Sequence, residues 1–448
     1  MAEMNWKPDE PGPSRPVWRP ARALAAAPVG APEGALAAAS EEAFIEAWFE
    51  YLPPEMVEQI LRHLPPKYLV RSRLVCSRWR YIINHIMKNQ MYWSKHCKTE
   101  FKNLYETARE KSYPVIGWRD LYRSLSSWKL LRNATETITE FLHSTCRPED
   151  LRYFKLLSHG ILAVHRIGSI VFYDINTLTE STTRSSIVGR FQRYSENEDF
   201  IITLGLEMQL HITKKDPENQ QPIPRSYENV KLFILTKTTL YFVNFLNDIF
   251  CCHLDSENIV ANNVTHMGEE IMNISFCDGT LNILTHHRRI YSLINGRIVL
   301  KVILYRNSNM LHDLNRFNFL KYMDWQIFFQ WILGMQIIFP NAPLRDIVIM
   351  KSYGRAYFVG FYDGVLNIYF STRNLNEFNI FKRRPVKQYN FGEYSGDPPE
   401  TVNKILNVDV VEKPFGHLVF VALPKNMVCI KLSHNFETEL SRVVVDND

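Results

Sequence analysis

The feature that most constrains the fold is a hairpin motif that occurs twice in the second half of the chain. The segments FCDGTLNIL and FYDGVLNIY, which begin at Phe276 and Phe361, share the pattern Phe-x-Asp-Gly-x-Leu-Asn-Ile. Asp-Gly between alternating apolar residues is typical of a tight turn between two strands. Gly279 and Gly364 stand about 85 residues apart, which is roughly two units of the ~40–45 residues expected for one propeller blade.

Similar strand–turn–strand patterns recur after about residue 130. Short runs rich in β-branched and aromatic residues alternate with turn residues, and each run predicts two strands joined by a tight turn. Turn points at Gly168, Glu207, Lys237 and Gly279 lie roughly one unit apart, so residues 129–448 predict roughly seven to eight units. The six clearest segments are ILAVHRIGSIVFYDI, DFIITLGLEMQLHI, VKLFILTKTTLYFVNF, IMNISFCDGTLNIL, AYFVGFYDGVLNIYF and HLVFVALPKNMVCIKL.

A β-propeller is the architecture that these repeats favour, because radial sheets hide most strand edges. A β-sandwich or another all-β array is the alternative. The region departs from WD repeats, since no Trp-Asp dipeptide ends a unit and Tyr173-Asp174 is the nearest equivalent. We therefore expect an α+β multidomain chain, in which a small all-α part is followed by an all-β, propeller-like domain over residues 131–448.

The first part of the chain reads differently. Residues 1–42 are rich in alanine and proline, and we expect this tail to be disordered. Pro53-Pro54 suits the first turn of a helix, and Pro65-Pro66 ends that helix. A second helix is expected from Lys67 to about Val75. A third carries Trp79, Ile82, Ile83 and Ile86 at helical spacing.

The first of these helices has more apolar surface than three short helices can cover. At ~100° per residue, its apolar residues span an arc of roughly 140°. Each such side chain is worth ~1.5–3 kcal/mol on burial. Part of the arc is therefore expected to contact something outside the three helices. Its members are Met56, Val57, Ile60, Leu61 and Leu64.

The segment from Leu52 to Trp93 resembles the F-box, and we place the domain at residues 45–93. The resemblance implies that the matching residues form the interface with a Skp-type adaptor and its supporting core. Which of them face the adaptor stays open, and simple core packing is the alternative. Cys76 is expected to be a small buried filler. The matching residues are Leu52, Pro53, Ile60, Leu61, Leu64, Leu74, Val75, Cys76 and Trp79, with Tyr92-Trp93 at the trailing aromatic position.

The same resemblance implies a function. It indicates the non-catalytic substrate receptor of a Skp–cullin–F-box (SCF) ubiquitin ligase, which reaches a cullin and a RING protein through the adaptor. The C-terminal β-domain would capture a protein substrate. Residues 94–130 are expected to be linker helices, and Trp118, Leu121, Tyr122, Leu125 and Trp128 follow helical spacing. A scaffold that binds the adaptor without delivering a substrate is the main alternative, and a propeller hydrolase is another.

Composition and charge argue against other classes. With 52 basic and 47 acidic residues, the net charge of +5 is too balanced to indicate nucleic-acid binding. The seven scattered cysteines form no CxxC pair, so we expect no metal site and a reducing compartment. The N-terminus lacks a secretory pattern. Polar residues interrupt the apolar stretch Phe319–Phe339, which suggests core rather than a membrane span. We expect a cytoplasmic or nuclear protein without a cofactor or membrane partner.

Several isolated features remain, and each has an ordinary structural explanation. The basic run 382–387 suggests a nuclear signal, and the run 286–289 suggests a phosphate contact, but exposed loops explain both. His143 and His165 lack metal-ligand spacing, and Asp278 and Asp363 suit turns better than catalysis. Trp325 and Trp331 suit either partner anchors or core. No catalytic motif such as GxSxG, a Walker loop or HExxH occurs. The substrate-binding residues stay unknown, although loops on one face of a propeller are the expected place.

Overall fold

The computed structural model describes residues 52–102, 104–142, 151–215, 225–255, 259–304, 313–314, 316–319, 347–371, 384–392 and 404–434. The chain divides into two compact units, Met1–Ile86 and Met87–Asp448. The predictions for the tail 1–42 and for His143, Trp325 and Trp331 fall outside the described residues.

The three predicted helices lie in the first unit, except that the last two residues of the third belong to the second unit. They are α2 (Pro54–Arg62), α3 (Pro66–Ser72) and α4 (Ser77–Lys88). Pro54 and Pro66 stand in first turns, where the missing N–H has no intrahelical partner to lose. Helix α3 is shorter than predicted, so the segment before α4 is a turn rather than helix.

Three helices and a 3₁₀ turn begin the second unit. They are α5 (Gln90–Glu100), α6 (Tyr105–Lys111), α7 (Trp118–Ser127) and η1 (Trp128–Asn133). The helix predicted around Trp118 is confirmed as α7, which buries Leu121 and Leu125. Residue 93, the predicted end of the F-box, lies inside α5 and thus in the second unit.

The rest of the described second unit is built from four-stranded antiparallel sheets. The described residues form six of them, each a meander of consecutive strands except for the last. The first three sheets are β2 (Leu151–Leu156), β3 (Ile161–Arg166), β4 (Ser169–Asp174) and β5 (Ile187–Val188); β6 (Phe191–Glu196), β7 (Phe200–Gly205), β8 (Leu210–Lys214) and β9 (Arg225–Tyr227); β10 (Val230–Leu235), β11 (Thr239–Asn244), β12 (Asp248–His253) and β13 (Asn262–His266).

The remaining three sheets continue the series, with one strand taken from the start of the unit. They are β14 (Ile271–Cys277), β15 (Thr280–Thr285), β16 (Arg289–Ile294) and β17 (Arg297–Ile303); β18 (Ile347–Tyr353), β19 (Ala356–Phe361), β20 (Val365–Phe370) and β21 (Lys387–Asn390); β22 (Asn407–Lys413), β23 (Gly416–Ala422) and β24 (Met427–Ser433) with β1 (Thr135–Phe141).

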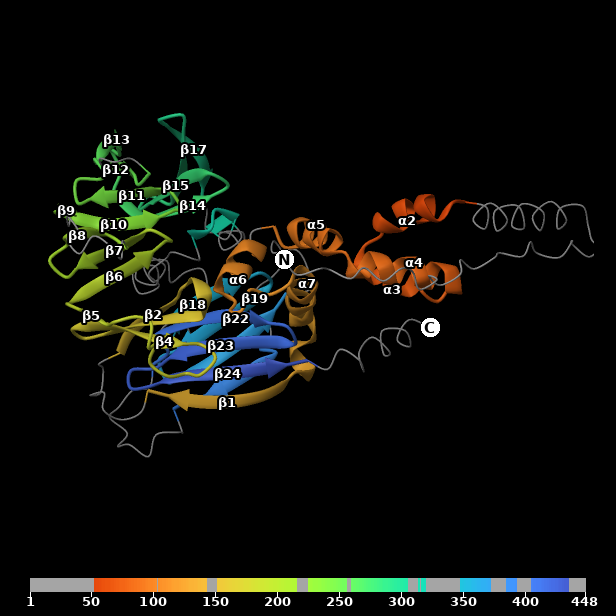
Figure 1. The fold of residues 1–448 in the computed structure, drawn as a ribbon. Helices are drawn as coiled ribbons and strands as arrows, with labels where there is room; N and C mark the ends of the chain where they lie inside the picture. Colours follow the sequence, from red (N-terminus) through yellow and green to blue (C-terminus); the bar gives the residue numbers. More distant parts are fainter. Residues whose placement is uncertain are drawn as a thin grey trace, which may run out of the picture. The chain divides into compact units, whose positions relative to one another are not determined.

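Two kinds of contact arrange the described sheets as a ring. The first strand of the unit pairs with its last described strand, and first strands of neighbouring sheets contact each other. Strand β1 pairs with β24 along its whole length, as Figure 1 shows where orange β1 lies beside blue β24. First strands of neighbouring sheets contact each other in four places: β2 with β22, β18 with β22, β6 with β10, and β10 with β14. This arrangement confirms the predicted all-β, propeller-like domain. The predicted count of seven to eight units includes residues outside the described ones.

The hairpin predictions are confirmed, but the spacing of the two Phe-x-Asp-Gly-x-Leu-Asn-Ile motifs does not give the length of a propeller blade. All six predicted segments are pairs of adjacent strands. Asp278-Gly279 joins the first and second strands of its sheet, whereas Asp363-Gly364 joins the second and third strands of another. The two motifs therefore occupy different positions within their sheets, so the 85-residue spacing does not correspond to a whole number of units. Asp-Gly suits any tight turn that needs positive φ, whichever strands it joins.

A structural repeat that the sequence does not reveal lies in the first strands. In five sheets the register between the first and second strands shifts by one residue near the start of the first strand. A bulge of this kind increases strand twist. The extra residues are Arg152, Gln192, Lys231, Met272 and Val348.

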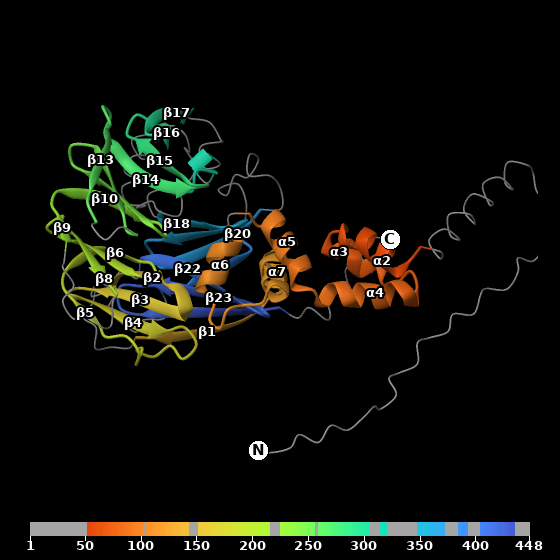
Figure 2. The same cartoon turned by 45° about the horizontal axis from the view of Figure 1, so that its top comes forward.

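Helix α6 and its neighbours cover one face of the ring. The first turns of all the sheets point to one face and the second turns to the other, because the first strands of a propeller run parallel. Lys111 of α6 binds Asp409 inside β22, and four further contacts of the α6 region are with first turns or the strand ends beside them, in four different sheets. They are Glu110 with Lys237 (3.8 Å), the Tyr113 carbonyl oxygen with Lys413 Nζ (3.2 Å), Leu104 beside Gly354, and Tyr113 beside Gly160. Figure 2 shows α6 beside β22.

The helices also share the hydrophobic core of the sheets. Leu121, Leu125 and Trp128 belong to one buried cluster with residues of β18 to β24. Phe319, the described start of the apolar stretch, is also buried in that cluster. The predicted linker helices are therefore part of the propeller's own packing.

Candidate adaptor-binding site

The apolar arc of α2 divides into two halves with different environments. Val57 and Leu61, four residues apart, are buried. Met56 and Ile60, also four residues apart, point to solvent, and Ile60 is 44% exposed whereas Leu61 is 1% exposed. One half of the arc thus packs inward and the other half is available to a partner.

The turn between α3 and α4 adds a second group of exposed apolar residues. Helix α3 ends at Ser72, and Leu74 and Val75 follow it with exposures of 67% and 65%. Cys76 is exposed and its sulfur accepts a hydrogen bond from the Trp79 N–H at 3.4 Å. The prediction that Cys76 is a buried filler is therefore wrong, because the short α3 leaves this residue in a turn.

The unit keeps a core without these residues. Leu69 of α3 and Ile82, Ile83 and Ile86 of α4 are buried, as the helical spacing predicts. The Arg78 guanidinium donates to the Leu52 carbonyl oxygen, which ties α4 to the chain just before α2. We call the exposed residues Met56, Ile60, Leu74 and Val75 the outer apolar set.

The predicted adaptor residues thus fall into three groups. Leu61 is buried and serves the core. Leu52, Leu64 and Trp79 are half-buried. Pro53, Ile60, Leu74, Val75 and Cys76 are exposed. Met56 is missing from the prediction although it belongs to the same arc, and Tyr68 of α3 is exposed as well. The adaptor-binding role of all of these residues stays a prediction.

The comparison with known families concerns this same segment. Residues 49–90 match the model of the F-box domain. The chain carries an F-box domain. An F-box domain implies binding to a Skp-type adaptor, and the outer apolar set of the F-box is a surface that such a partner can cover.

The comparison with solved structures concerns the sheets. The chain is similar to the N-terminal domain of Nup159 (10% identity, 67% of this chain and 96% of that chain, TM-score 0.37). It is also similar to Hsv2 of Kluyveromyces lactis (11% identity, 62% of this chain and 78% of that chain, TM-score 0.31). A third similar structure is the β-propeller domain of Cps50 (Swd1) of Myceliophteria thermophila (9% identity, 66% of this chain and 100% of that chain, TM-score 0.35). No curated protein matches the chain. The propeller architecture rests on the strand pairings described above.

A buried polar cluster that the sequence does not reveal joins α7 to the last sheet. Ser127 Oγ lies 3.0 Å from His417 Nε2, and His417 Nδ1 lies 2.8 Å from the Glu412 carboxylate. This order of contacts resembles a hydrolase triad. All three residues are buried, however, and Glu412 also accepts hydrogen bonds from Ser124 and from Trp128 Nε1 at 2.9 Å. The cluster is therefore a connection between α7, β22 and β23.

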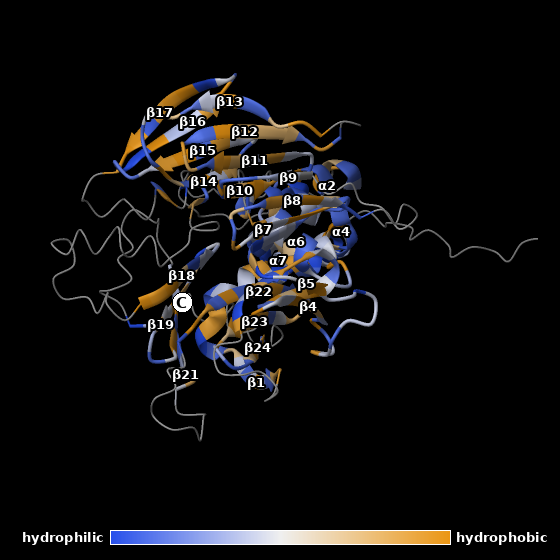
Figure 3. Cartoon of the chain, turned by 90° about the vertical axis from the view of Figure 1, so that its left-hand side faces the viewer, coloured by the Kyte–Doolittle hydropathy of each residue, from blue (hydrophilic) through white to orange (hydrophobic). Residues whose placement is uncertain are grey.

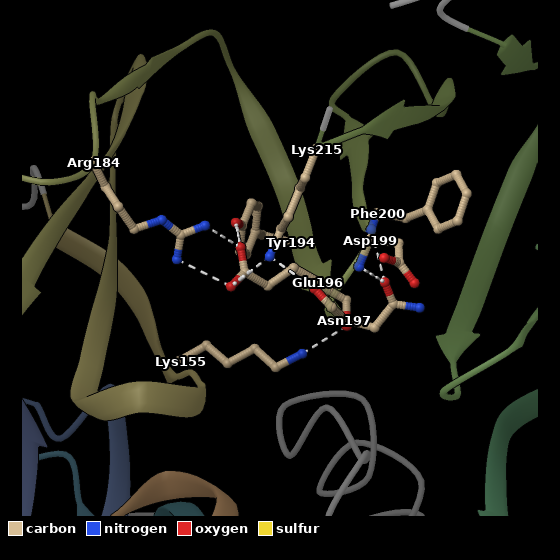
Figure 4. A network of polar contacts seen from close by, with 9 residues as sticks. Lys155, Arg184, Tyr194, Glu196, Asn197, Asp199, Phe200 and Lys215 are labelled. Atoms are coloured by element: carbon tan, nitrogen blue, oxygen red, sulfur yellow. Dashed lines mark hydrogen bonds and ion pairs between the residues drawn. The ribbon is translucent and has the colours of Figure 1, made fainter. Parts of the chain in front are cut away.

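A second polar network lies between two sheets and is drawn in Figure 4. Its centre is Glu196, whose carboxylate is bound by Arg184, Tyr194 and, at 3.1 Å, Lys215. Burial alone raises the pKa of Glu196, but these donors and cations hold that pKa below its usual value. Nearby, Lys155 Nζ donates to Ser195 Oγ at 2.7 Å and joins two first strands. Every group is satisfied by a neighbour, so the network serves to hold the sheets together.

The other candidates from the sequence lie apart from each other. Asp278 and Asp363 belong to different sheets, as predicted for turn residues. His286 Nε2 lies 3.6 Å from the Glu270 carboxylate, and Arg289 forms an ion pair with Glu269. Burial, and secondarily Lys155, lowers the pKa of His165 to about 3. The described residues contain no group of acidic, histidine or cysteine side chains that could hold a metal ion. No described helix has the length and apolarity needed to cross a bilayer.

Proposed function

We propose that this chain is the substrate receptor of an SCF-type ubiquitin ligase in the cytoplasm or nucleus. The F-box binds a Skp-type adaptor, and the propeller holds a protein substrate. The cullin-bound RING protein and its conjugating enzyme carry out the transfer, so the chain itself supplies position rather than chemistry. The observation that carries the proposal is the outer apolar set, which is exposed on a domain that keeps its own core.

Burial of the outer apolar set supplies the energy for docking. Each of Met56, Ile60, Leu74 and Val75 is worth ~1.5–3 kcal/mol when it leaves water completely. Left uncovered, exposed apolar groups of this kind promote aggregation. A dedicated partner therefore stabilises the F-box as well as recruiting the ligase.

Substrate capture is best supported on the face opposite α6. The second turns of the sheets point there, and turns usually carry small or polar residues. In this chain four second turns carry exposed large apolar residues, which have no role in forming a turn. They are Ile167, Leu206, Phe245, Leu246 and Tyr362.

Adaptor binding tests the first step. The double variant Leu74→Ser with Val75→Ser removes two exposed side chains and leaves the core intact. We expect its affinity for a purified Skp-type adaptor to fall about 100-fold, as for loss of a central interface contact. Gln59→Ala, on the polar side of α2, is the matched control and should bind as the wild type does. Unchanged affinity of the double variant would contradict the proposal.

Ligase function needs a second experiment, because a scaffold also binds the adaptor. The wild-type chain with adaptor, cullin and RING protein should transfer ubiquitin to a protein that the propeller retains. The same mixture with the Leu74→Ser/Val75→Ser variant should not. If the adaptor binds but no cullin joins the complex, the scaffold alternative is correct instead.

A further inference from the structure

The outer strands of the sheets differ in how they protect their free edges. An exposed strand edge offers unpaired N–H and C=O groups to other chains, so most edges are short or polar. Strand β5 has two residues and β9 has three. Strands β1 (TETITEF), β13 (NNVTH) and β21 (KQYN) are rich in polar residues. These five edges follow the usual protective pattern.

Strand β17 does not follow this pattern. It has seven residues, RIVLKVI, and most of them are exposed. Val299, Leu300 and Ile303 are 39%, 47% and 38% exposed. Strand β17 ends its sheet, and no described strand pairs with its outer side. Figure 3 shows it as the outermost strand of its sheet, with largely apolar colouring.

The hairpin geometry identifies the groups on the open edge. Asn295 and Gly296, both with positive φ, form a two-residue turn between β16 and β17. The residues that flank such a turn, Ile294 and Arg297, are a hydrogen-bonded pair. Hydrogen-bonded and non-hydrogen-bonded pairs then alternate, so Ile298 and Leu300 direct their N–H and C=O groups away from β16.

The charges on β17 indicate the chemistry of a partner strand. The strand carries Arg297 and Lys301 and no acidic residue, and both basic side chains are exposed. Lys301 is the extra residue of a bulge in the pairing with β16. A bulge with lysine discourages indiscriminate pairing along an edge. A partner strand with carboxylate side chains can still pair with this edge, because its carboxylates form ion pairs with Arg297 and Lys301.

We propose that the β17 edge binds an extended segment of a partner protein that alternates apolar and acidic residues. The segment adds a fifth strand to the sheet, with its backbone bonded to Ile298 and Leu300. Because successive side chains of a strand point to opposite faces, its apolar side chains lie beside Leu300 and its acidic side chains lie on the other face, beside Arg297. A second copy of this chain is a poor occupant, because two β17 strands would place four basic side chains along one seam. This site is separate from the F-box and does not rest on adaptor binding.

A pair of synthetic peptides tests the site on the full chain. We expect fluorescein-labelled acetyl-Glu-Val-Glu-Val-Glu-Val amide to bind, by anisotropy, and the lysine counterpart Lys-Val-Lys-Val-Lys-Val not to bind. Lys301→Glu should weaken the acidic peptide about 10-fold and should gain affinity for the basic one. Leu300→Pro should abolish binding of the acidic peptide, because it removes an edge N–H. Its N–H faces solvent, so proline is compatible with the fold there.

Three results would overturn the inference. The first is failure of the acidic peptide to bind the wild-type chain. The second is equal affinity of the wild type and Lys301→Glu for both peptides. The third is a wild-type dimer in sedimentation that Leu300→Pro dissociates, since the occupant would then be a second copy. Ile60→Ser, in the outer apolar set, should bind the acidic peptide as the wild type does, which separates this site from adaptor docking.

Discussion

Ile60 and Leu61 are neighbours in the sequence with opposite environments. A helix turns by ~100° per residue, so one step along α2 moves a side chain from solvent to core. The sequence shows that both belong to an apolar arc, but only the packing of α3 and α4 decides which half is covered. His165 is a second residue whose environment decides its behaviour, because a histidine inside a sheet must stay neutral to remain buried.

His165 makes the stability of the propeller depend on pH. The ring is 3% exposed, contacts Tyr153 and Tyr194, and lies near Lys155. Burial lowers its pKa to about 3, whereas an unfolded chain binds the proton near pH 6.5. Stability is therefore full above about pH 6.5 and falls as the pH drops toward 3. When the pH falls from 7.5 to 5, the free energy of unfolding should decrease in both proteins. We expect this decrease to be about 1–2 kcal/mol smaller in His165→Phe than in the wild type, as measured by urea unfolding. An equal loss in both proteins would contradict this assignment.

Helix α7 and the β22–β23 hairpin act as one element because of a single carboxylate. Glu412 is buried and accepts hydrogen bonds from Ser124 and Trp128 of the helical region while it contacts His417. Burial by itself raises the pKa of Glu412, but His417 and these donors hold the pKa below its usual value. A second connection joins Lys111 of α6 to Asp409, at 2.7 Å, and Lys351 also lies near Asp409.

Removal of the Glu412 carboxylate should loosen this element strongly. Glu412→Ala leaves the Trp128 N–H and His417 buried without their partner, so we expect a loss of about 3–5 kcal/mol in the free energy of unfolding. Glu110→Ala is the matched control, because its pair with Lys237 is exposed and such pairs contribute at most ~1 kcal/mol. Urea unfolding followed by tryptophan fluorescence measures both. If the free energy of unfolding decreased by similar amounts in the two variants, the Glu412 cluster would contribute no more to stability than an exposed ion pair does.

At the scale of the whole molecule, the helices before the sheets belong to the propeller unit. Leu121, Leu125 and Trp128 fill its core, and α6 covers one face of the ring. A fragment that begins at residue 131 would expose that core and leave Asp409 and Glu412 with fewer partners. A substrate screen should therefore use the unit that begins at Met87.

Two fragments test this statement directly. We expect residues 87–448 to unfold in one cooperative thermal transition. Residues 131–448 should aggregate or melt at least about 10 °C lower, since several kcal/mol of core contacts are missing. Differential scanning calorimetry measures both, and equal melting temperatures would show that the helices are dispensable.

The parts of this structure that follow from local patterns were predictable. Alternating apolar residues and turn residues locate all six hairpins, and proline and apolar spacing locate α2, α4 and α7. The pattern gives neither the exposure of Cys76, which depends on where α3 ends, nor the position of each hairpin within its sheet. Contacts such as Ser127 with His417 join residues 290 apart, and no spacing rule connects them.

The pairing of β1 with β24 also determines the order of events during translation. Thr135 and its partner Ser433 lie 298 residues apart. During translation β1 therefore stays unpaired until β24, the last described strand, has left the ribosome. The alternating threonine and glutamate residues of β1 keep that waiting segment compatible with water. A premature stop codon anywhere before β24 would therefore leave β1 unpaired. We expect the truncated chain to be aggregation-prone and degraded by quality-control proteases rather than to function as a smaller protein.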